Sequence, residues 1–330
     1  MRKLRKITFL SLVLSLAITL VFTTSYVSTS HAKEIKEILV FGDSLSDTGN
    51  LYIAGLANGL NFPESPPYDT GRFSNGLVWV EYLALALNVT PPIPSNVGGT
   101  NYSWGGAETG DGISARGTPN IGEQIYTFFG PDPTNPNIPN ENQLIVIWAG
   151  SNDFNNSDTL PPDPQSLVDN IIEHIKTLAF SSPEEKLKFL VPNLPPLGQT
   201  ARAQCLGQYD PAIPLILDGL SAEFNFLLLK ELKKVKKELK KEYSIKVKIF
   251  RLDIYSLTKE ILNDPISFGF TNVTDTARIG IDDLGCPLDV TAPNQGVVVN
   301  ADEYLFFDDV HPTTTFHEAV ADRALELIDN

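Results

Sequence analysis

The chain has 330 residues, of which 40 are Asp or Glu and 25 are Lys or Arg, so its formal net charge is −15 at pH 7. This length is enough for one large domain with a sizeable hydrophobic core. The excess of acidic residues would repel a polyanion, which argues against a nucleic-acid-binding protein.

The first 32 residues have the features of a secretory signal. Four positive charges in MRKLRK precede the apolar run ITFLSLVLSLAITLVF, and small residues end this segment at Ala32. We expect residues 1–32 to be removed, which leaves residues 33–330 as one secreted or periplasmic domain. That domain has 21 Lys and Arg against 40 Asp and Glu, a formal charge of −19. An uncleaved membrane anchor is the alternative, because the apolar run approaches the length of a spanning helix.

Strands and helices are expected to alternate along the rest of the chain. Short apolar runs predict buried strands at 38–41, 144–148, 187–191 and 247–252, with a weaker one at 97–102. Apolar residues recur at helical spacing in 77–87, 163–180, 220–243 and 313–329. Nearly continuous apolar strands between helices predict an α/β protein with a mostly parallel sheet covered on both faces.

The helix expected at 220–243 has a lysine-rich face. Nine Lys and three Glu occur between Lys230 and Lys248, whereas Leu228, Leu232 and Val235 recur on one face. We interpret the lysines as a solvated face opposite a packed one. Attraction to the headgroups of a lipid surface is the alternative, and the sequence leaves the oligomeric state open.

The two cysteines, Cys205 and Cys286, have two interpretations. They form one disulfide in an oxidising compartment, or they remain two separate thiols. Sequence alone does not place their Cα atoms within bonding distance of each other, so both interpretations stay open. No histidine lies near either cysteine, so a zinc site is not indicated.

Three histidines follow the signal segment, and one of them has a marked environment. His174 lies beside the apolar face of its helix and is interpreted as a surface or boundary residue, and His317 falls early in the last helix without a marked partner. His311 lies in FFDDVHPTT, where Pro312 disfavours helical geometry. Asp308 can therefore bind one imidazole nitrogen and leave the other for a serine, although a loop of helix-capping groups is the alternative.

With the loop around His311, four polar segments carry candidate groups, the other three being FGDSLSDTGN (41–50), TNYSWGGAETG (100–110) and AGSNDF (149–154). Three of the four follow apolar runs and are therefore expected to converge on one crevice. Ligands gather outside the carboxyl ends of parallel strands. Acyl transfer also needs donors to a developing oxyanion, which a glycine N–H and an asparagine amide can supply.

The blocks FGDSLSDTGN, NYSWGGA, GSND and DDVHPT, in this order, resemble those of the GDSL, or SGNH, hydrolase family. The resemblance spans residues 41–313, and GRFSNGLVWVEYLA (71–84) resembles the family's branch of bacterial secreted lipases and acyltransferase-like phospholipases. It implies a flavodoxin-like three-layer α/β/α sandwich with a five-stranded parallel sheet, and no metal or organic cofactor. The absence of a GxSxG motif also counts against the ordinary α/β-hydrolase fold.

The resemblance also implies roles for individual residues. Ser44 is the expected nucleophile, His311 the general base and Asp308 the residue that orients His311. Asp309 is a rival to Asp308, but the family's Asp-x-x-His spacing selects Asp308. Ser46 is left as a turn residue.

The expected oxyanion donors are the Ser44 N–H, the Gly106 N–H and the Asn152 side chain. The resemblance does not securely separate Gly106 from Gly105. Asp43 and Asp47 are expected to shape the turn around Ser44.

The expected activity is therefore that of a secreted esterase or lipase acting through an acyl-enzyme at Ser44. Lipid esters, such as lysophospholipid or phospholipid, rank first because of the branch resemblance and the expected export. Transfer of the acyl group to an alcohol acceptor and hydrolysis of carbohydrate O-acetyl esters are the enzymatic alternatives. A non-enzymatic extracellular protein, whose acidic loops hold a cation, is the alternative from another class.

Overall fold

The computed structural model describes residues 35–330, apart from residue 135, residues 156–160 and residues 184–185. The expected signal segment at 1–32 lies outside the described residues. Its removal, and the organisation of residues 33–330 as one domain, stay predictions.

A parallel sheet forms the centre of the protein, with strand order β1-β2-β3-β4. The strands are β1 (Glu37–Gly42), β2 (Gln143–Trp148), β3 (Lys188–Pro192) and β4 (Lys248–Leu252). β2 and β3 are buried along their whole length, as expected for central strands covered on both faces. The four stronger apolar runs of the sequence therefore correspond to the four strands of this sheet.

The expected fifth strand at 97–102 needs a correction. Ser95–Val97 form a short 3-10 helix (η2), and only Asn101 pairs with β1, through a bridge to Val40. The Val40 N–H donates to the Thr100 carbonyl oxygen, and the Tyr102 N–H donates to the Val40 carbonyl oxygen. The Gly42 N–H, which would extend this pairing, donates to the Gln124 side chain at 2.9 Å instead. An extended segment still lies beside β1, so the flavodoxin-like order is kept with this segment at the edge.

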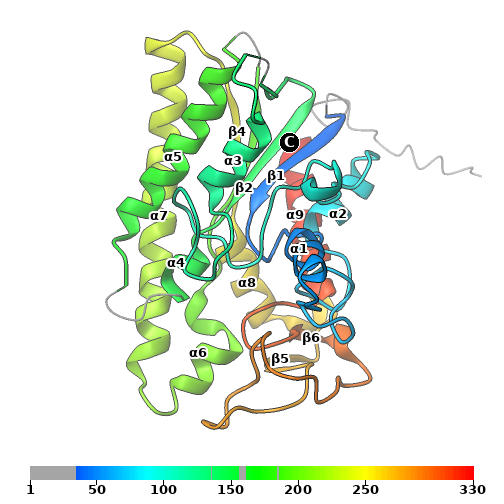
Figure 1. The fold of residues 1–330 in the computed structure, drawn as a ribbon. Helices are drawn as coiled ribbons and strands as arrows, with labels where there is room; N and C mark the ends of the chain where they lie inside the picture. Colours follow the sequence, from blue (N-terminus) through cyan, green and yellow to red (C-terminus); the bar gives the residue numbers. More distant parts are fainter. Residues whose placement is uncertain (1–34, 135, 156–160, 184–185) are drawn as a thin grey trace, which may run out of the picture.

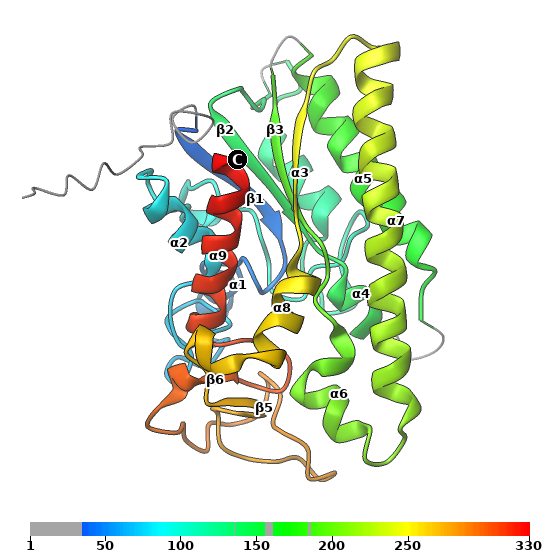
Figure 2. The same ribbon diagram turned by 180° about the vertical axis from the view of Figure 1, so that it is seen from behind.

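Helices cover both faces of the sheet (Figures 1 and 2). Leu39 and Phe41 of β1 belong to one apolar core and Ile38 and Val40 to the other, because side chains alternate along a strand. The first core is shared with α3 (Ile121–Phe129), α5 (Pro164–Ser181) and α7 (Ala212–Glu242), and the second with α2 (Trp79–Ala86), α8 (Ile254–Asn263) and α9 (Thr314–Asp329). The predicted α/β/α sandwich is confirmed.

Shorter elements gather at the carboxyl end of the sheet, in the lower half of Figure 1. The strands β5 and β6 pair there in a small parallel sheet. The bounds of these elements are α1 (Asn50–Ala57), α4 (Ser151–Asn155), η3 (Leu197–Gln199), α6 (Ala201–Leu206), η4 (Pro265–Phe268), β5 (Asn272–Thr276), η5 (Ala301–Glu303) and β6 (Tyr304–Phe306).

The helix α7 is amphipathic, as the sequence predicts. Phe224, Leu228, Leu232, Val235 and Leu239 are buried against the sheet, whereas the lysines from 230 to 241 are exposed. Within the described part of the chain, α7 is also the one helix whose length and apolar composition would suffice to cross a membrane. One face of α7 packs along α5 and the sheet (Figure 2), although only 17% of its most apolar stretch is buried.

Cys205 and Cys286 are joined in a disulfide, with their Cα atoms 5.6 Å apart. Cys205 lies in α6, and Cys286 lies in the loop between β5 and β6. Of the two interpretations that the sequence leaves open, the structure contains the bonded one. The crosslink ties this long loop to the helical side of the molecule.

Replacing both cysteines with serine should lower the free energy of unfolding by about 4 kcal/mol, because the bond closes a loop spanning 81 positions and restricts the unfolded chain. Equilibrium unfolding in urea measures this difference. A reducing agent should lower the midpoint of the wild type and leave that of the double variant unchanged. Equal stability of the two oxidised proteins would contradict the prediction.

Candidate active site

The turn after β1 presents Ser44 at the carboxyl end of the sheet. The Leu45 N–H donates to the Asp43 carboxylate at 3.0 Å, and the Ser46 and Asp47 N–H groups donate to the Asp43 carbonyl oxygen. A side chain at the preceding Gly42 would be crowded, because a Cβ there would lie 3.0 Å from the Trp148 carbonyl oxygen. Asp43 therefore shapes the turn, as expected.

Asp47 holds the same turn against the helix that follows it. Its carboxylate accepts the N–H groups of Gly49 and Asn50 at 2.8 and 2.7 Å. It also accepts the Gly105 N–H at 3.0 Å, which links the turn to the glycine loop. Burial raises the pKa of Asp47 to about 6, and these hydrogen bonds oppose that rise.

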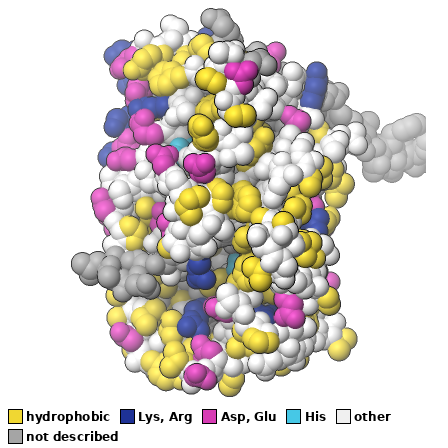
Figure 3. Space-filling view, in the orientation of Figure 1, with side chains coloured by type: hydrophobic (Ala, Val, Ile, Leu, Met, Phe, Trp, Pro, Cys, Tyr) yellow, Lys and Arg dark blue, Asp and Glu magenta, His cyan; other side chains and the backbone are white. Residues whose placement is uncertain are grey.

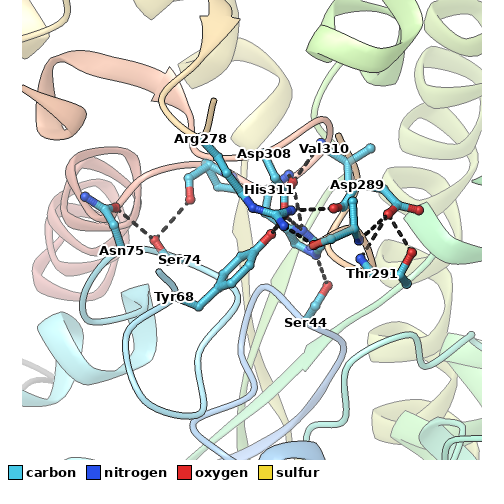
Figure 4. Close-up of polar contacts among 12 residues, drawn as sticks. Ser44, Tyr68, Ser74, Asn75, Arg278, Asp289, Thr291, Asp308, Val310 and His311 are labelled. Carbon is cyan, nitrogen blue, oxygen red and sulfur yellow. Dashed lines mark hydrogen bonds and ion pairs between the residues drawn. The ribbon is translucent and has the colours of Figure 1, made fainter. Parts of the chain in front are cut away.

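Ser44, His311 and Asp308 form one hydrogen-bonded line (Figure 4). The Ser44 Oγ lies 2.9 Å from the His311 Nε2, and the His311 Nδ1 lies 2.8 Å from the Asp308 Oδ2. The Asp308 Oδ1 accepts the backbone N–H groups of Val310 and His311 at 3.0 and 2.7 Å. Because the carboxylate accepts Nδ1–H, Nε2 is left to accept the serine proton.

The electrostatics of this line favour a charged aspartate and a basic histidine. Burial alone would raise the pKa of Asp308, but His311 and the hydrogen bonds to the carboxylate lower it below its ordinary value. Burial lowers the pKa of His311, yet the charge and hydrogen bond of Asp308 outweigh it, so the net pKa is raised. Asp309 does not bind His311, and burial together with the charge of Asp308 raises the pKa of Asp309 to about 8.

Three groups remain candidate oxyanion donors: the N–H groups of Ser44 and Gly106 and the side-chain amide of Asn152, which lines the same pocket as Ser44. Gly106 has φ +81°, a left-handed conformation suited to glycine. The Gly105 N–H is used by Asp47, whereas neither the Gly106 N–H nor the Ser44 N–H donates to any described residue. This difference favours Gly106 over Gly105. One hydrogen of the Asn152 amide donates to the Ala107 carbonyl oxygen at 3.0 Å, which leaves the second hydrogen for a ligand.

The other two histidines do not contact the line. The interpretation of His174 as a surface or boundary residue is wrong, because His174 is buried and its Nε2 lies 2.8 Å from the Thr109 carbonyl oxygen. It supports the loop that follows Gly106. His317 is also buried, and neither ring nitrogen meets a partner among the described residues. Burial lowers its pKa to about 3, so it stays neutral at physiological pH.

Sequence reasoning missed Tyr68 and Arg278. The Tyr68 hydroxyl donates to the Asp308 Oδ2 at 2.5 Å, and the Arg278 Nη1 lies 3.4 Å from the Tyr68 oxygen. Both side chains are buried. Tyr68 precedes Asp308 by 240 positions, and no motif in the sequence connects the two residues. Of the sequence blocks that carry the family resemblance, only GRFSNG lies near either residue along the chain, and it begins three residues after Tyr68.

An apolar pocket opens beside Ser44, His311 and Asn152. Its walls are mainly hydrophobic, with contributions from Leu45, Trp148, Pro195, Pro196, Leu197, Leu305, Phe306, Val310 and Phe316. Polar side chains, among them Gln199, Thr200 and Thr258, also line this pocket, and its hydrophobic walls suit a hydrocarbon chain.

A flavodoxin-like sandwich with a serine, a histidine and an aspartate at the carboxyl ends of its strands defines a class of serine acylhydrolases. The sequence profile described as GDSL-like Lipase/Acylhydrolase matches residues 38–324. The chain belongs to this GDSL family, and the family predicted from the sequence blocks is confirmed.

Curated relatives include proteins from bacteria and plants. The chain is 27% identical to a "Phosphatidylcholine-sterol acyltransferase" of Aeromonas hydrophila, over 89% of this chain and 90% of that protein. It is 26% identical to a "Thermolabile hemolysin" of Vibrio parahaemolyticus, over 90% of this chain but only 65% of that protein. A GDSL esterase/lipase of Arabidopsis thaliana is 27% identical over 95% of this chain and 90% of its own length.

Solved structures with a similar chain include a GDSL-like lipase of Parabacteroides merdae. It has 14% identity and a TM-score of 0.42, and the match covers 89% of this chain and 95% of that one. A carbohydrate esterase family 2 enzyme of Myceliophthora fergusii has 16% identity and a TM-score of 0.42, over 89% of this chain and 65% of that one.

Proposed function

We propose that this acylhydrolase is an exported serine esterase that hydrolyses lipid esters, such as lysophospholipid or phospholipid, through an acyl-enzyme at Ser44. The observation that carries the proposal is the continuous line from the Ser44 Oγ through both nitrogens of His311 to Asp308. The expected signal at 1–32 and the disulfide between Cys205 and Cys286 support export, because disulfides persist in oxidising compartments.

The geometry gives each group a role in the proposed reaction. The His311 Nε2 takes the proton of the Ser44 hydroxyl while the Ser44 Oγ bonds to the ester carbonyl carbon. The N–H groups of Ser44 and Gly106 and the second amide hydrogen of Asn152 stabilise the oxyanion. Protonated His311 then gives its proton to the leaving alcohol as the carbon–oxygen bond breaks. A water molecule, deprotonated by His311, attacks the acyl-enzyme; His311 then returns the proton to the Ser44 Oγ as the acyl carbon–Oγ bond breaks and the carboxylic acid leaves.

The pocket supports an acyl chain as the group transferred to Ser44. Its apolar walls include Leu45, Phe306 and Phe316, and Trp148 lies at the end of β2. Burial of a methylene group in such a pocket is worth roughly 0.8 kcal/mol, so a longer chain should bind more tightly than acetate. The apolar lining therefore favours a lipase over a carbohydrate O-acetyl esterase.

Exposed hydrophobic side chains around α6 and the start of α7 support peripheral contact with a lipid surface. Tyr209 and Leu215 follow α6, and their side chains are 65% and 74% exposed. The Tyr209 hydroxyl donates to the carbonyl oxygen of Leu284, whose side chain is also exposed. Hydrophobic side chains are visible at this lower end of the molecule in Figure 3. Exposed hydrophobic side chains that gather on one surface often mark an interaction site.

Acyl transfer to an alcohol is a second candidate, because the Aeromonas relative is named as an acyltransferase. Hydrolysis and transfer share the acyl-enzyme and differ only in whether water or an alcohol attacks it. Measuring ester product in the presence of an added alcohol, together with free fatty acid, separates the two reactions.

The direct test is a chain-length and lipid-class assay of purified residues 33–330. We expect kcat/KM on nitrophenyl esters to rise from acetate to octanoate, and fatty acid to be released from lysophosphatidylcholine. The Ser44→Ala variant serves as the control for contaminating esterases. Activity restricted to acetate would sink the lipid proposal and favour the O-acetyl esterase.

A further inference from the structure

A buried tyrosine closes the far side of Asp308, opposite the serine. Tyr68 is 1% exposed, and its ring packs edge-on against Phe307 with centroids 5.0 Å apart. Its hydroxyl donates to the Asp308 Oδ2, the same oxygen that faces the His311 Nδ1. The ring packing leaves the hydroxyl little freedom, so it fixes where this carboxylate oxygen lies.

A buried arginine lies behind the tyrosine (Figure 4). Arg278 is 1% exposed, and its guanidinium carbon lies 5.4 Å from the centre of the Tyr68 ring. The Nη1 and Nη2 groups donate to the carbonyl oxygens of Asp289 and Ala292, in the loop that contains the disulfide. Among the described residues, Arg278 makes no ion pair with a carboxylate. Its positive charge therefore faces the phenol and, beyond it, Asp308.

The order of charges along this line is Arg278, the Tyr68 hydroxyl, Asp308 and His311. A positive charge behind a hydroxyl makes that hydroxyl a stronger donor, because hydrogen-bonded groups polarise one another. The pKa of Tyr68 is raised by burial and by Asp308, so the phenol keeps its proton and donates it to the carboxylate. Asp308 thus accepts Tyr68 and two backbone N–H groups in addition to the His311 Nδ1–H.

We infer that Tyr68 and Arg278 are positioning residues of the hydrolytic site, acting through Asp308 to fix the orientation and basicity of His311. This inference rests on the proposed ester hydrolysis and adds two residues to it. Neither side chain touches the serine, so both act only through the aspartate. Loss of a residue that orients a catalytic group in this way typically lowers kcat and leaves substrate binding unchanged.

The matched test compares Tyr68→Phe with Tyr82→Phe on a soluble ester, nitrophenyl butyrate. Tyr82 is a suitable control because its hydroxyl also forms one hydrogen bond, to the Thr314 Oγ1 at 2.8 Å, outside the line. We expect Tyr68→Phe to lower kcat by about 10-fold with KM nearly unchanged, and Tyr82→Phe to behave as the wild type.

The pH profile separates positioning from mere structural support. Without the phenol, Asp308 keeps more of its negative charge for His311, so the histidine binds its proton more tightly. The acidic limb of the kcat/KM profile should therefore shift to higher pH by about half a unit in Tyr68→Phe. Asp43 and Asp309 also raise the pKa of His311, but they are unchanged in this variant. A structural role would lower the yield or stability and leave this limb in place.

The second variant, Arg278→Lys, keeps a positive charge but loses the paired contacts with two carbonyl oxygens. We expect a smaller loss of kcat than in Tyr68→Phe, and no further loss when the two substitutions are combined. Arg278→Lys alone also serves as the test if Tyr68→Phe does not fold. If the wild type is active, and if kcat and the acidic limb of the pH profile are unchanged in whichever of these variants folds, the inference is overturned. An inactive wild type would instead overturn the proposed function.

Discussion

Replacing Ser44 with alanine should lower kcat/KM for ester hydrolysis by at least ~10³-fold, because the variant has no group to form the acyl-enzyme. The fold should be retained, since the turn is held by Asp43 and Asp47 rather than by the serine hydroxyl. Rates on nitrophenyl butyrate measure the loss. Mass spectrometry after treatment with a serine-directed phosphonate should show labelling of the wild type and none of the variant.

Ser46 provides the control within the same turn. Its Oγ accepts the indole N–H of Trp79 at 3.0 Å and takes no part in the hydrogen-bonded line. Ser46→Ala should therefore remain active, at a cost of about 1 kcal/mol of stability for the lost hydrogen bond. Unchanged hydrolysis by Ser44→Ala, or inactivity of folded Ser46→Ala, would refute the choice of Ser44 as nucleophile.

The second large effect is expected for Asp308→Asn, which should lower kcat by about 10³-fold. An asparagine must turn its carbonyl oxygen toward the Val310 and His311 N–H groups, because its NH₂ group would oppose these donors. The NH₂ group then faces the His311 Nδ1, which must accept. The imidazole hydrogen moves to Nε2, where it points at Ser44 and cannot receive the serine proton. Purified variant and wild type are compared at saturating ester.

Asp309→Asn is the matched control, because Asp309 is the adjacent buried acid. Its raised pKa, about 8, means that it is largely protonated near neutral pH, so an amide resembles it closely. We expect activity within a few-fold of the wild type. If Asp309→Asn were inactive and Asp308→Asn active, the two residues would have to exchange roles.

The wild-type pH profile follows from the same pair. His311 is active as a base only when it is unprotonated, and its raised pKa places the loss of activity above the ordinary histidine value of 6.5. Activity should fall as the pH drops through that raised value. In Asp308→Asn the anionic partner is gone, so the residual activity should persist to lower pH than in the wild type.

The sheet was predictable because buried parallel strands are short and continuously apolar. β2, for instance, reads LIVIW from 144 to 148 and is buried on both faces. The segment beside β1 was predicted poorly, because its pairing ends after one bridge, where the Gly42 N–H donates to the Gln124 side chain at 2.9 Å. Gln124 lies 82 positions from Gly42, so this competing hydrogen bond is visible only in three dimensions.

The site was predictable only where its residues lie close together along the chain. Asp308 and His311 are three positions apart, so their contact follows from local geometry and the family's spacing. Tyr68 and Arg278 reach Asp308 from distant loops, and their residue types carry no signal of that contact. His174 was misjudged because its place beside the apolar face gave no sign of the Thr109 carbonyl that it binds.

The place of Trp148 gives the pocket a built-in optical reporter. The chain has three tryptophans, and Trp148 lines the proposed acyl site while packing edge-on against Trp79 with ring centroids 5.5 Å apart. A hydrocarbon chain that enters this space changes the surroundings of an indole that is otherwise 1% exposed. Intrinsic fluorescence can therefore follow ligand occupancy without an attached dye, and a brominated fatty acid would serve as a contact quencher.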